Sequence, residues 1–514
     1  MPSTDMSTAE FLLAEGRPDD IAVIDRTGHH SYAELRDQVA LLSHDIGEWG
    51  LEPGSRIGLL SRNSLFWAAA YLAILGSGHV AVPFATGLTP QDVASKAAFV
   101  GCDSFLVDRA LTRRFEPALA HARQVRDDAV QVSPQDARPW RPAAVDPDAD
   151  AVLVFTSGTT SAPRAVRVTH RNIQANTDSI ISYLDLRRDD RMLVVLPFSY
   201  CFGASLLHTH LRVGASVSLS DSLAYPETVI EAIDRDACTG FAGVPSSYQL
   251  LLRASSFASR ALPSLRHLQQ AGGRLPQPQI DQIVAAQPHA RLFVMYGQTE
   301  ATARLSYLPP ELLRERQGSI GKGVPGVTLG VLDADGVEVD AGVVGQIVAS
   351  GASIAKGYWD DPQGTSEKFV AGTLRTGDLG RVDEDGFIYV VDRQDDFIKS
   401  WGFRISSHEI EDAVLELSGV AAAAVVGRPD DEAGEAIVAY YTVKDGEVVT
   451  AVDVLTHCRS TLARHQVPHE AHEVAELPTN QNGKVVKSTL RQWAARGVNQ
   501  AADPEKEETL CAPG

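Results

Sequence analysis

A run of small hydroxyl residues and glycine between Val154 and Val166 has the clearest chemical potential in this sequence. It reads Val-Phe-Thr-Ser-Gly-Thr-Thr-Ser-Ala-Pro-Arg-Ala-Val and begins inside an apolar segment, 151–155, that predicts a β-strand. Backbone N–H groups and hydroxyls gathered after a strand can wrap a polyphosphate. The Gly-Lys-Ser/Thr ending of P-loop nucleotide hydrolases does not follow. The run therefore predicts a phosphate-binding loop of a different kind.

Two further clusters place carboxylates where they could hold a cation or a sugar. Tyr-Gly-Gln-Thr-Glu, ending at Glu300, follows the apolar segment 291–294, and a carboxylate there suits a hard cation such as Mg²⁺. A Thr-Gly-Asp turn ends at Asp378, and Arg393 follows fifteen positions later. The carboxylate can accept two hydrogen bonds from a cis-diol, and the guanidinium can bind a ribose or a phosphate as a fork of donors. Taken singly, each cluster is also explained by a strand end followed by a turn.

Two lysines stand in turn-like sequences nearer the C-terminus. The run from Asp395 to Ile405 contains Lys399 and Gly402, and Asn-Gly-Lys ends at Lys484. An Asn-Gly-Lys sequence on its own is typical of a surface hairpin turn. An amphipathic strand after a turn would explain the apolar positions of 395–405, but not its ordered acids, lysine and glycine.

Taken together and in order, these clusters resemble the signature motifs of the adenylate-forming superfamily, which includes acyl-CoA synthetases, luciferases and peptide-synthetase adenylation domains. The resemblance covers about residues 31–490. It implies a nucleotide site for ATP and AMP formed by Thr156, Ser157, Gly158, Thr159, Thr160, Arg164, Tyr296, Gly297, Thr299, Asp378 and Arg393. It implies direct roles in the reaction for Lys484, Thr299, Glu300, Lys399 and Gly402, with Mg²⁺ on Glu300.

The same resemblance implies what several of these residues do. Lys484 would bridge the substrate carboxylate and the α-phosphate, stabilising charge that grows during adenylation. Lys399 would serve the second half-reaction, and Gly402 would let the pantetheine of coenzyme A pass close to the backbone. Asp395 would be the hinge about which a small C-terminal domain turns.

The phosphate loop departs from the family pattern at two positions. Ser161 stands where glycine is usual, and Arg164 where lysine is usual. The planar guanidinium cannot simply replace an ammonium contact, and a Cβ at position 161 would cost about 1–2 kcal/mol if the backbone there has a positive φ. Both changes bear on the β- and γ-phosphates, which are present only in the ATP half-reaction.

Several functions therefore remain open. The first is a complete ligase, in which an acid and ATP give acyl-AMP and coenzyme A then displaces AMP. The second is a ligase with weak or absent adenylation, which uses acyl-AMP made by a separate adenylating enzyme. An acyl-AMP ligase that loads a carrier protein, and a nucleotide-binding scaffold without activity, are further alternatives.

The predicted acyl pocket is made of small and apolar residues. The segment 196–203 lacks the aspartate with which amino-acid-activating domains hold the substrate amine, and no carrier-protein domain follows. We expect the substrate to be a small-molecule carboxylic acid with an uncharged, medium-to-bulky body. The pocket residues are Tyr200, Phe202, Gly203, Ala242, Gly243, Val244, Ala271, Gly272 and Gly273.

Composition excludes some partners. The net charge of −20 argues against nucleic acid or an anionic membrane as a partner. The apolar helix expected at 65–75 is too short to span a bilayer. No secretory signal is visible at residues 1–5. The five cysteines are far apart in sequence and show no metal spacing, so we expect reduced thiols in a cytoplasmic monomer or homodimer.

The elements that must position these residues predict an α/β protein. Its 514 residues are too many for one core. Alternating apolar strands and helical segments predict two α/β sheet subdomains, and the hairpin signals between 318 and 391 predict a small β-barrel-like subdomain. We expect an N-terminal AMP-binding domain at 1–394, a mobile α+β C-terminal domain at 395–498, and an acidic, disordered tail at 499–514.

Overall fold

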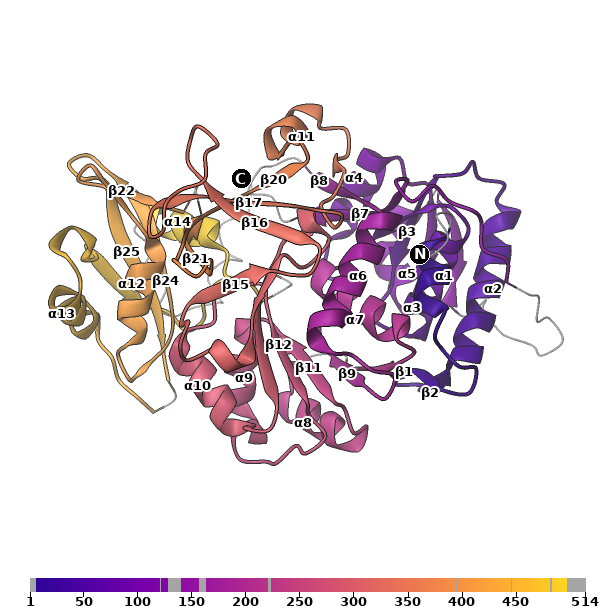
Figure 1. The fold of residues 1–514 in the computed structure, drawn as a ribbon, viewed down its shortest axis with the longest axis horizontal. Coiled ribbons are helices and arrows are strands. Elements are labelled where there is room, and N and C mark those ends of the chain that lie inside the picture. Colours follow the sequence, from indigo (N-terminus) through magenta and orange to yellow (C-terminus); the bar gives the residue numbers. More distant parts are fainter. Residues whose placement is uncertain are drawn as a thin grey trace, which may run out of the picture. The chain divides into compact units, whose positions relative to one another are not determined.

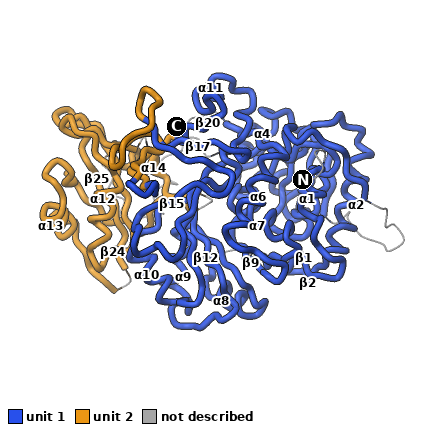
Figure 2. Tube along the Cα trace, viewed as in Figure 1, with its two compact units in different colours: residues 1–332, 347–376, 383–388 blue, residues 333–346, 377–382, 389–514 orange. Residues whose placement is uncertain are grey.

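The structure is a computed structural model. It describes residues 6–120, 122–127, 140–156, 163–220, 223–393, 396–444, 446–480 and 483–496. The chain forms two compact units (Figure 2). The first comprises residues 1–332, 347–376 and 383–388, and the second comprises 333–346, 377–382 and 389–514. Three strands contribute residues to both units: β17 (Val344–Gly351), β20 (Thr373–Val382) and β21 (Ile388–Arg393).

The first unit contains two sheets with parallel centres (Figure 1). One has the order β18-β8-β7-β4-β3-β5-β6, in which β7 and β8 are antiparallel and the strands from β7 to β6 run parallel. Its central strands are apolar on both faces, as parallel strands covered by helices on both sides must be. Its bounds are β3 (Arg56–Leu60), β4 (Val80–Pro83), β5 (Ser104–Val107), β6 (Arg123–Arg126), β7 (Asp150–Thr156), β8 (Arg164–Thr169) and β18 (Gly357–Tyr358).

The second sheet of this unit runs parallel from β13 through β12, β11, β9 and β10 to β1. Antiparallel strands flank it, with β2 beside β1, and β14 and β15 beyond β13. The bounds are β1 (Ile21–Asp25), β2 (Gly28–Ser31), β9 (Arg191–Val194), β10 (Ser216–Leu219), β11 (Gly240–Gly243), β12 (His267–Gln270), β13 (Arg291–Tyr296), β14 (Ser306–Leu308), β15 (Ser319–Gly323), β16 (Val327–Leu332) and β19 (Phe369–Val370).

Helices pack against both sheets of the first unit. The largest core packs α3, α6 and α7 against apolar residues of both sheets. Two smaller cores place α4 and α5 on the first sheet, and α8, α9 and α10 on the second. The bounds are α1 (Thr8–Leu13), α2 (Tyr32–Glu48), α3 (Leu65–Gly76), α4 (Pro90–Val100), α5 (Arg109–Leu119), α6 (His170–Leu184), α7 (Cys201–Arg212), α8 (Pro226–Arg235), α9 (Pro245–Ala254), α10 (Gln277–Ala286) and α11 (Pro362–Lys368).

Helix α3 shows why the sequence folds this way. All twelve of its residues are buried, so it is apolar around its whole circumference and must lie in a core. The Ser64 hydroxyl caps it by accepting a hydrogen bond from the backbone N–H of Trp67. The helix expected at 65–75 is therefore a core helix and not a membrane span.

The second unit contains a small α+β module. Its antiparallel strands β23, β22, β25 and β24 follow one another, and β26 pairs parallel with β25. Helices α12 and α13 share one hydrophobic core with this sheet, and α14 shares a second hydrophobic core with it. The bounds are β22 (Ile398–Ser400), β23 (Phe403–Ile405), β24 (Val420–Asp430), β25 (Gly434–Val443), β26 (Glu470–Glu473), α12 (Ser407–Leu415), α13 (Ala451–Thr461) and α14 (Lys487–Arg496).

The predicted fold class is confirmed: the protein is α/β, with a large N-terminal part and a small C-terminal module. The described strands form open sheets, so the barrel-like subdomain stays a prediction. The boundary at 394/395 also stays a prediction, because both residues lie outside the described ones, as does the predicted tail. Four cysteines are buried and free, and Cys511 lies outside the described residues.

Candidate active site

The predicted phosphate loop connects two paired strands. Strand β7 ends at Thr156 and β8 begins at Arg164, and these two residues are register partners. The strand predicted before the loop is thus confirmed. The loop itself, including Ser157, Gly158, Thr159, Thr160 and Ser161, lies outside the described residues.

Arg164 is already engaged by two neighbours within the first unit. Its guanidinium forms an ion pair with Asp361 at 3.2 Å. Its Cζ lies over the ring of Tyr358, 4.7 Å from the ring centroid. Asp361 also caps α11, since its carboxylate accepts a hydrogen bond from the backbone N–H of Gly364. The cation at position 164 is therefore held in place by the fold, with one carboxylate partly offsetting its charge.

Tyr358 connects Arg164 to the predicted magnesium ligand. The Tyr358 hydroxyl donates a 2.8 Å hydrogen bond to Oε1 of Glu300. Burial raises the pKa of Tyr358 above its usual range, and the negative charge of Glu300 raises it further. The tyrosine thus stays a neutral donor, and it fixes one oxygen of the Glu300 carboxylate.

The segment from Tyr296 to Glu300 leaves β13 where the backbone turns sharply. A Cβ on Gly297 would come within 1.9 Å of the carbonyl oxygen of Ala303, so only glycine fits. Thr299 is 7% exposed, and its hydroxyl lies 3.6 Å from Sγ of Cys201 at the start of α7. The close backbone packing at Gly297 therefore places Thr299 and Glu300 in a turn just beyond the end of β13.

The predicted ribose-binding pair comes together in the second unit. Nε of Arg393 lies 3.3 Å from Oδ1 of Asp378, whose side chain is 9% exposed while that of Arg393 is 54% exposed. The buried acid is thereby oriented by a cation that still faces solvent.

Lys484 stands on the turn that its sequence predicted. Thr479 and Val485 form a bridge, Asn480 and Lys484 exchange turn hydrogen bonds, and Gly483 has a φ of +73°. Desolvation by the surrounding protein, together with the positive charge of Arg393, lowers the pKa of Lys484 to about 8. The residue is exposed to water, so an ammonium group that titrates near pH 8 stands at an accessible position.

Lys399 and Gly402 belong to one hairpin. Strands β22 and β23 are joined by Trp401 and Gly402, with φ values of +53° and +79°. Two successive positive φ values are typical of a type I′ turn. A Cβ on Gly402 would meet no atom within 4 Å, so in this structure the glycine serves the backbone conformation. The predicted hinge, Asp395, lies outside the described residues.

The nine predicted acyl-pocket residues lie around α7, β11 and β12. Phe202, Ala242, Val244 and Ala271 are buried. A Cβ on Gly203 would meet the carbonyl oxygen of Pro197 at 2.1 Å, so packing within the protein explains that glycine. Gly243 has Ser247 within 2.8 Å of its would-be Cβ, Gly273 approaches Pro245, and Gly272 has a φ of +88°. The backbone and its packing therefore require small residues at several of these pocket positions.

Sequence reasoning missed Arg304. Its guanidinium lies 4.0 Å from the ring centroid of Phe202, and its Nε donates to Sδ of Met295. The residue is 2% exposed, and one terminal nitrogen has no hydrogen-bond partner among the described residues. The charge four positions beyond Glu300 is the only signal the sequence offered, because its burial comes from packing between α7 and β13. Tyr358 was missed too, since nothing in its sequence neighbourhood indicates its contact with Glu300.

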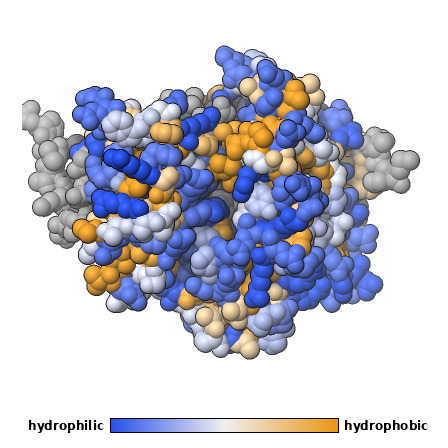
Figure 3. Space-filling view, turned by 60° about the vertical axis from the view of Figure 1, so that its left-hand side comes forward, coloured by the Kyte–Doolittle hydropathy of each residue, from blue (hydrophilic) through white to orange (hydrophobic). Residues whose placement is uncertain are grey.

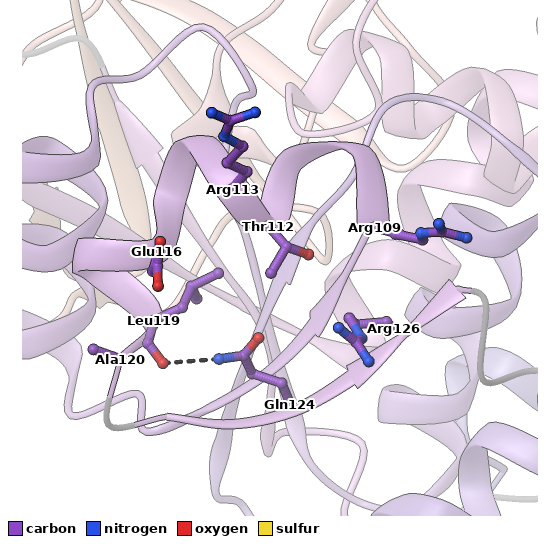
Figure 4. Close-up of a pocket in the computed structure, with 8 residues that line it drawn as sticks. All are labelled: Arg109, Thr112, Arg113, Glu116, Leu119, Ala120, Gln124 and Arg126. Carbon is purple, nitrogen blue, oxygen red and sulfur yellow. Dashed lines mark hydrogen bonds between the residues drawn. The ribbon is translucent and has the colours of Figure 1, made fainter.

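A separate hollow lies beside α5 and β6 (Figure 4). Arg109, Arg113, Glu116 and Arg126 line it, and the side chain of Gln124 donates to the carbonyl of Leu119. None of the predicted site residues lines it. We assign this hollow no role.

Comparison with known proteins agrees with the motifs. Residues 13–359 match the AMP-binding enzymes, and residues 409–484 match the C-terminal domain of AMP-binding enzymes. A feruloyl-CoA synthase of Amycolatopsis sp. is 32% identical over 466 residues, which cover 90% of this chain and 93% of that protein. A 2-succinylbenzoate–CoA ligase of Bacillus cereus is 28% identical and covers 92% of this chain and 96% of its own.

Solved structures show the same fold. ATP-bound MatB from Rhodopseudomonas palustris superposes with a TM-score of 0.86 and 26% identity, over 95% of this chain and 99% of its own. The o-succinylbenzoate CoA synthetase of Bacillus subtilis, in complex with its acyl-adenylate intermediate, has a TM-score of 0.84 and 26% identity, over 95% and 98% of the two chains. Among the described residues, no helix is both long enough and apolar enough to cross a bilayer. Figure 3 shows hydrophilic residues over much of the visible face, with hydrophobic residues gathered near its upper centre. The chain belongs to the family of AMP-binding enzymes.

Proposed function

We propose that this protein is an AMP-forming acid–thiol ligase that converts a hydrophobic carboxylic acid into its coenzyme A thioester. The carboxylate attacks the α-phosphate of ATP, giving acyl-AMP and pyrophosphate. The thiol of coenzyme A then attacks the acyl carbon, and AMP leaves. Similarity along nine-tenths of the chain to CoA synthases and ligases carries this proposal, together with site residues in the family order.

Glu300 fits the metal that this chemistry needs. Its Oε1 accepts from Tyr358, and no described residue donates to its Oε2. Mg²⁺ is commonly held by one or two carboxylates together with substrate phosphates, and Glu300 would supply such a carboxylate. When bound, Mg²⁺ would neutralise phosphate charge that develops during adenylation. Tyr358 contributes by fixing the carboxylate that would hold the ion.

The remaining residues divide between binding and charge stabilisation. We infer that Asp378 accepts hydrogen bonds from the ribose hydroxyls, while Arg393 orients it and donates to the nucleotide. Lys484 would donate to the oxygens between the substrate carboxylate and the α-phosphate, where negative charge grows. Lys399 and Gly402, on the β22–β23 hairpin, would serve the thioester half.

One observation favours a second candidate, a ligase whose own adenylation is weak. Arg164 is held by Asp361 and Tyr358, whereas the family has a lysine at this place. A guanidinium that is bound to a carboxylate is less available to the β- and γ-phosphates. A protein of this kind would receive acyl-AMP from a separate adenylating enzyme.

Two assays on the same preparation separate the candidates. Acid-dependent exchange of pyrophosphate into ATP reports adenylation, and coenzyme A addition to synthetic acyl-AMP reports the second half. Robust exchange would exclude the second candidate. Product from acyl-AMP without exchange would support it, and the variant Ser161→Gly with Arg164→Lys should then raise exchange. Failure of both assays across a broad panel of acids would refute the ligase itself.

A further inference from the structure

A narrow hollow runs along one face of α7 in the first unit. Tyr200, Ala204 and His208 line it at successive turns of the helix, a rise of about 12 Å. Cys201 and Thr302 line it as well, and Sγ of Cys201 lies 3.6 Å from the hydroxyl of Thr299. The hollow therefore adjoins the predicted adenylate site, although Tyr200 is the only predicted acyl-pocket residue in its wall.

The wall is mainly apolar. Strands β7 and β8 contribute Val152, Val154 and Val168, and α6 contributes Ile173. Two polar wall residues are already committed within the protein. Asn176 exchanges hydrogen bonds with the backbone of Arg304, and Ser205 donates to the carbonyl of Phe202. The space is about 30 Å³, enough for one or two waters before side chains adjust.

Tyr71 and His208 place a polar pair in this apolar wall. Nε2 of His208 lies 3.0 Å from the Tyr71 hydroxyl, and the two rings stack with centroids 5.5 Å apart. Tyr71 is 1% exposed and His208 is 5% exposed. Burial lowers the pKa of His208 to about 3 and raises that of Tyr71. Both groups are thus neutral at any pH at which the protein would work.

The Tyr71–His208 pair contains more hydrogen-bond donors than their mutual bond uses. A neutral imidazole has one N–H and a tyrosine has one O–H, so the pair carries two donors. Their mutual bond uses one, whichever tautomer is present. The structure gives neither side chain another hydrogen-bond partner among the described residues. One donor is therefore left over in the wall of an apolar hollow, where it is costly to leave unpaired.

We propose that the hollow receives the distal end of the acid substrate, and that Tyr71 and His208 select acids carrying an oxygen acceptor far from the carboxyl group. This inference rests on the proposed ligase function and adds the chemistry of the substrate's distal end. A hydroxyl, ether or carbonyl oxygen would accept a hydrogen bond from the pair. A methyl group of similar size would leave the donor unpaired.

Wild-type enzyme gives the first test. Cinnamic acids bearing a 4-hydroxyl, 4-methoxy or 4-methyl group are compared by kcat/KM for coenzyme A ester formation. We expect the oxygenated acids to exceed the methyl acid by about tenfold, the factor that corresponds to one hydrogen bond of about 1.4 kcal/mol. A methyl acid that performs equally well or better would overturn the inference.

Variants of Tyr71 and His208 test whether these two residues cause the preference for oxygenated acids. Tyr71→Phe with His208→Leu removes both donors and should reduce the 4-hydroxyl to 4-methyl ratio to about one, whereas His208→Gln keeps a donor and should retain the preference. Tyr32→Phe is the matched control. It removes another fully buried tyrosine hydroxyl, bonded to the carbonyl of Ala215 and absent from the hollow, and should leave the ratio unchanged.

The outcomes separate the inference from the function on which it rests. An unchanged ratio in a folded, active double variant overturns the inference alone. No ester from any acid, either with ATP or from acyl-AMP, refutes the ligase function and the inference with it. If the double variant does not fold, as judged by thermal unfolding, the wild-type series decides the question.

Discussion

The predicted residues of the two units are held in different ways. In the first unit, Thr299 is buried and Glu300 is bonded to Tyr358, which itself lies under Arg164. In the second, Lys484 stands on an exposed turn, and Lys399 is an exposed residue of β22 next to a turn. Substitutions in the first unit should therefore disturb ligand binding and folding together. Substitutions on the turns of the second should change the chemistry while the fold survives.

Lys484→Ala should have the largest effect. Removing one donor to developing negative charge typically lowers a rate by about 10²–10³-fold. We expect that loss in pyrophosphate exchange, with the thermal midpoint of unfolding nearly unchanged because the side chain is exposed. Coenzyme A addition to synthetic acyl-AMP should keep most of its rate. An equal loss in both half-reactions would contradict the role given to this lysine.

Tyr358→Phe should weaken the binding of Mg²⁺ at Glu300 in the first unit. It removes the donor to Oε1 of Glu300 while preserving the ring beneath Arg164. Losing the outer partner of a metal ligand commonly costs about 10–100-fold in metal affinity or activity. We expect the Mg²⁺ concentration for half-maximal adenylation to rise within that range. Phe369→Leu, a change in the ring packed on the edge of Tyr358, serves as the control, and an equal shift there would show that packing alone is responsible.

The pH dependence of adenylation tests the Lys484 environment from another direction. With a pKa of about 8, the lysine is charged below that pH and loses its charge above it. Exchange activity should thus fall by about tenfold for each pH unit above the pKa. Lys484→Arg keeps its charge at these pH values and should be slower but flat from pH 8 to pH 9. A wild-type profile that is equally flat would contradict the lowered pKa.

The sequence predicted strands and turns well where local signals are strong. The apolar runs 151–155 and 291–294 lie within strands β7 and β13, and the Asn-Gly-Lys sequence is a turn. It could not predict contacts that tertiary packing creates. Tyr358 meets Glu300 across 58 positions, and Tyr71 meets His208 across 137. The same packing restricts the glycines of the predicted acyl pocket, because a Cβ on Gly203 would meet the backbone of Pro197. Their place in the pocket stays a prediction.

The smallest effect concerns the turn that carries Gly402. Trp401 has a φ of +53° and is 56% exposed, so it bears the cost of a left-handed backbone while burying little surface. Asn-Gly is the favoured pair for a type I′ turn, since asparagine tolerates this conformation better. Trp401→Asn should therefore raise the free energy of unfolding by about 1 kcal/mol in urea titrations.

Trp401→Val is the opposing change at the same exposed position. A β-branched residue is strained at positive φ, so it should lower the free energy of unfolding relative to Trp401→Asn. Neither variant should alter pyrophosphate exchange, because the residue lies on a turn assigned to the thioester half. A stability loss in Trp401→Asn would mean that the indole packs in a way that outweighs its backbone strain. A rise in the KM for coenzyme A without any change in adenylation would place this turn at the thiol substrate. The two units would then differ in function as well, because Thr299 and Glu300 of the first unit act in adenylation and this turn of the second acts in thioester formation.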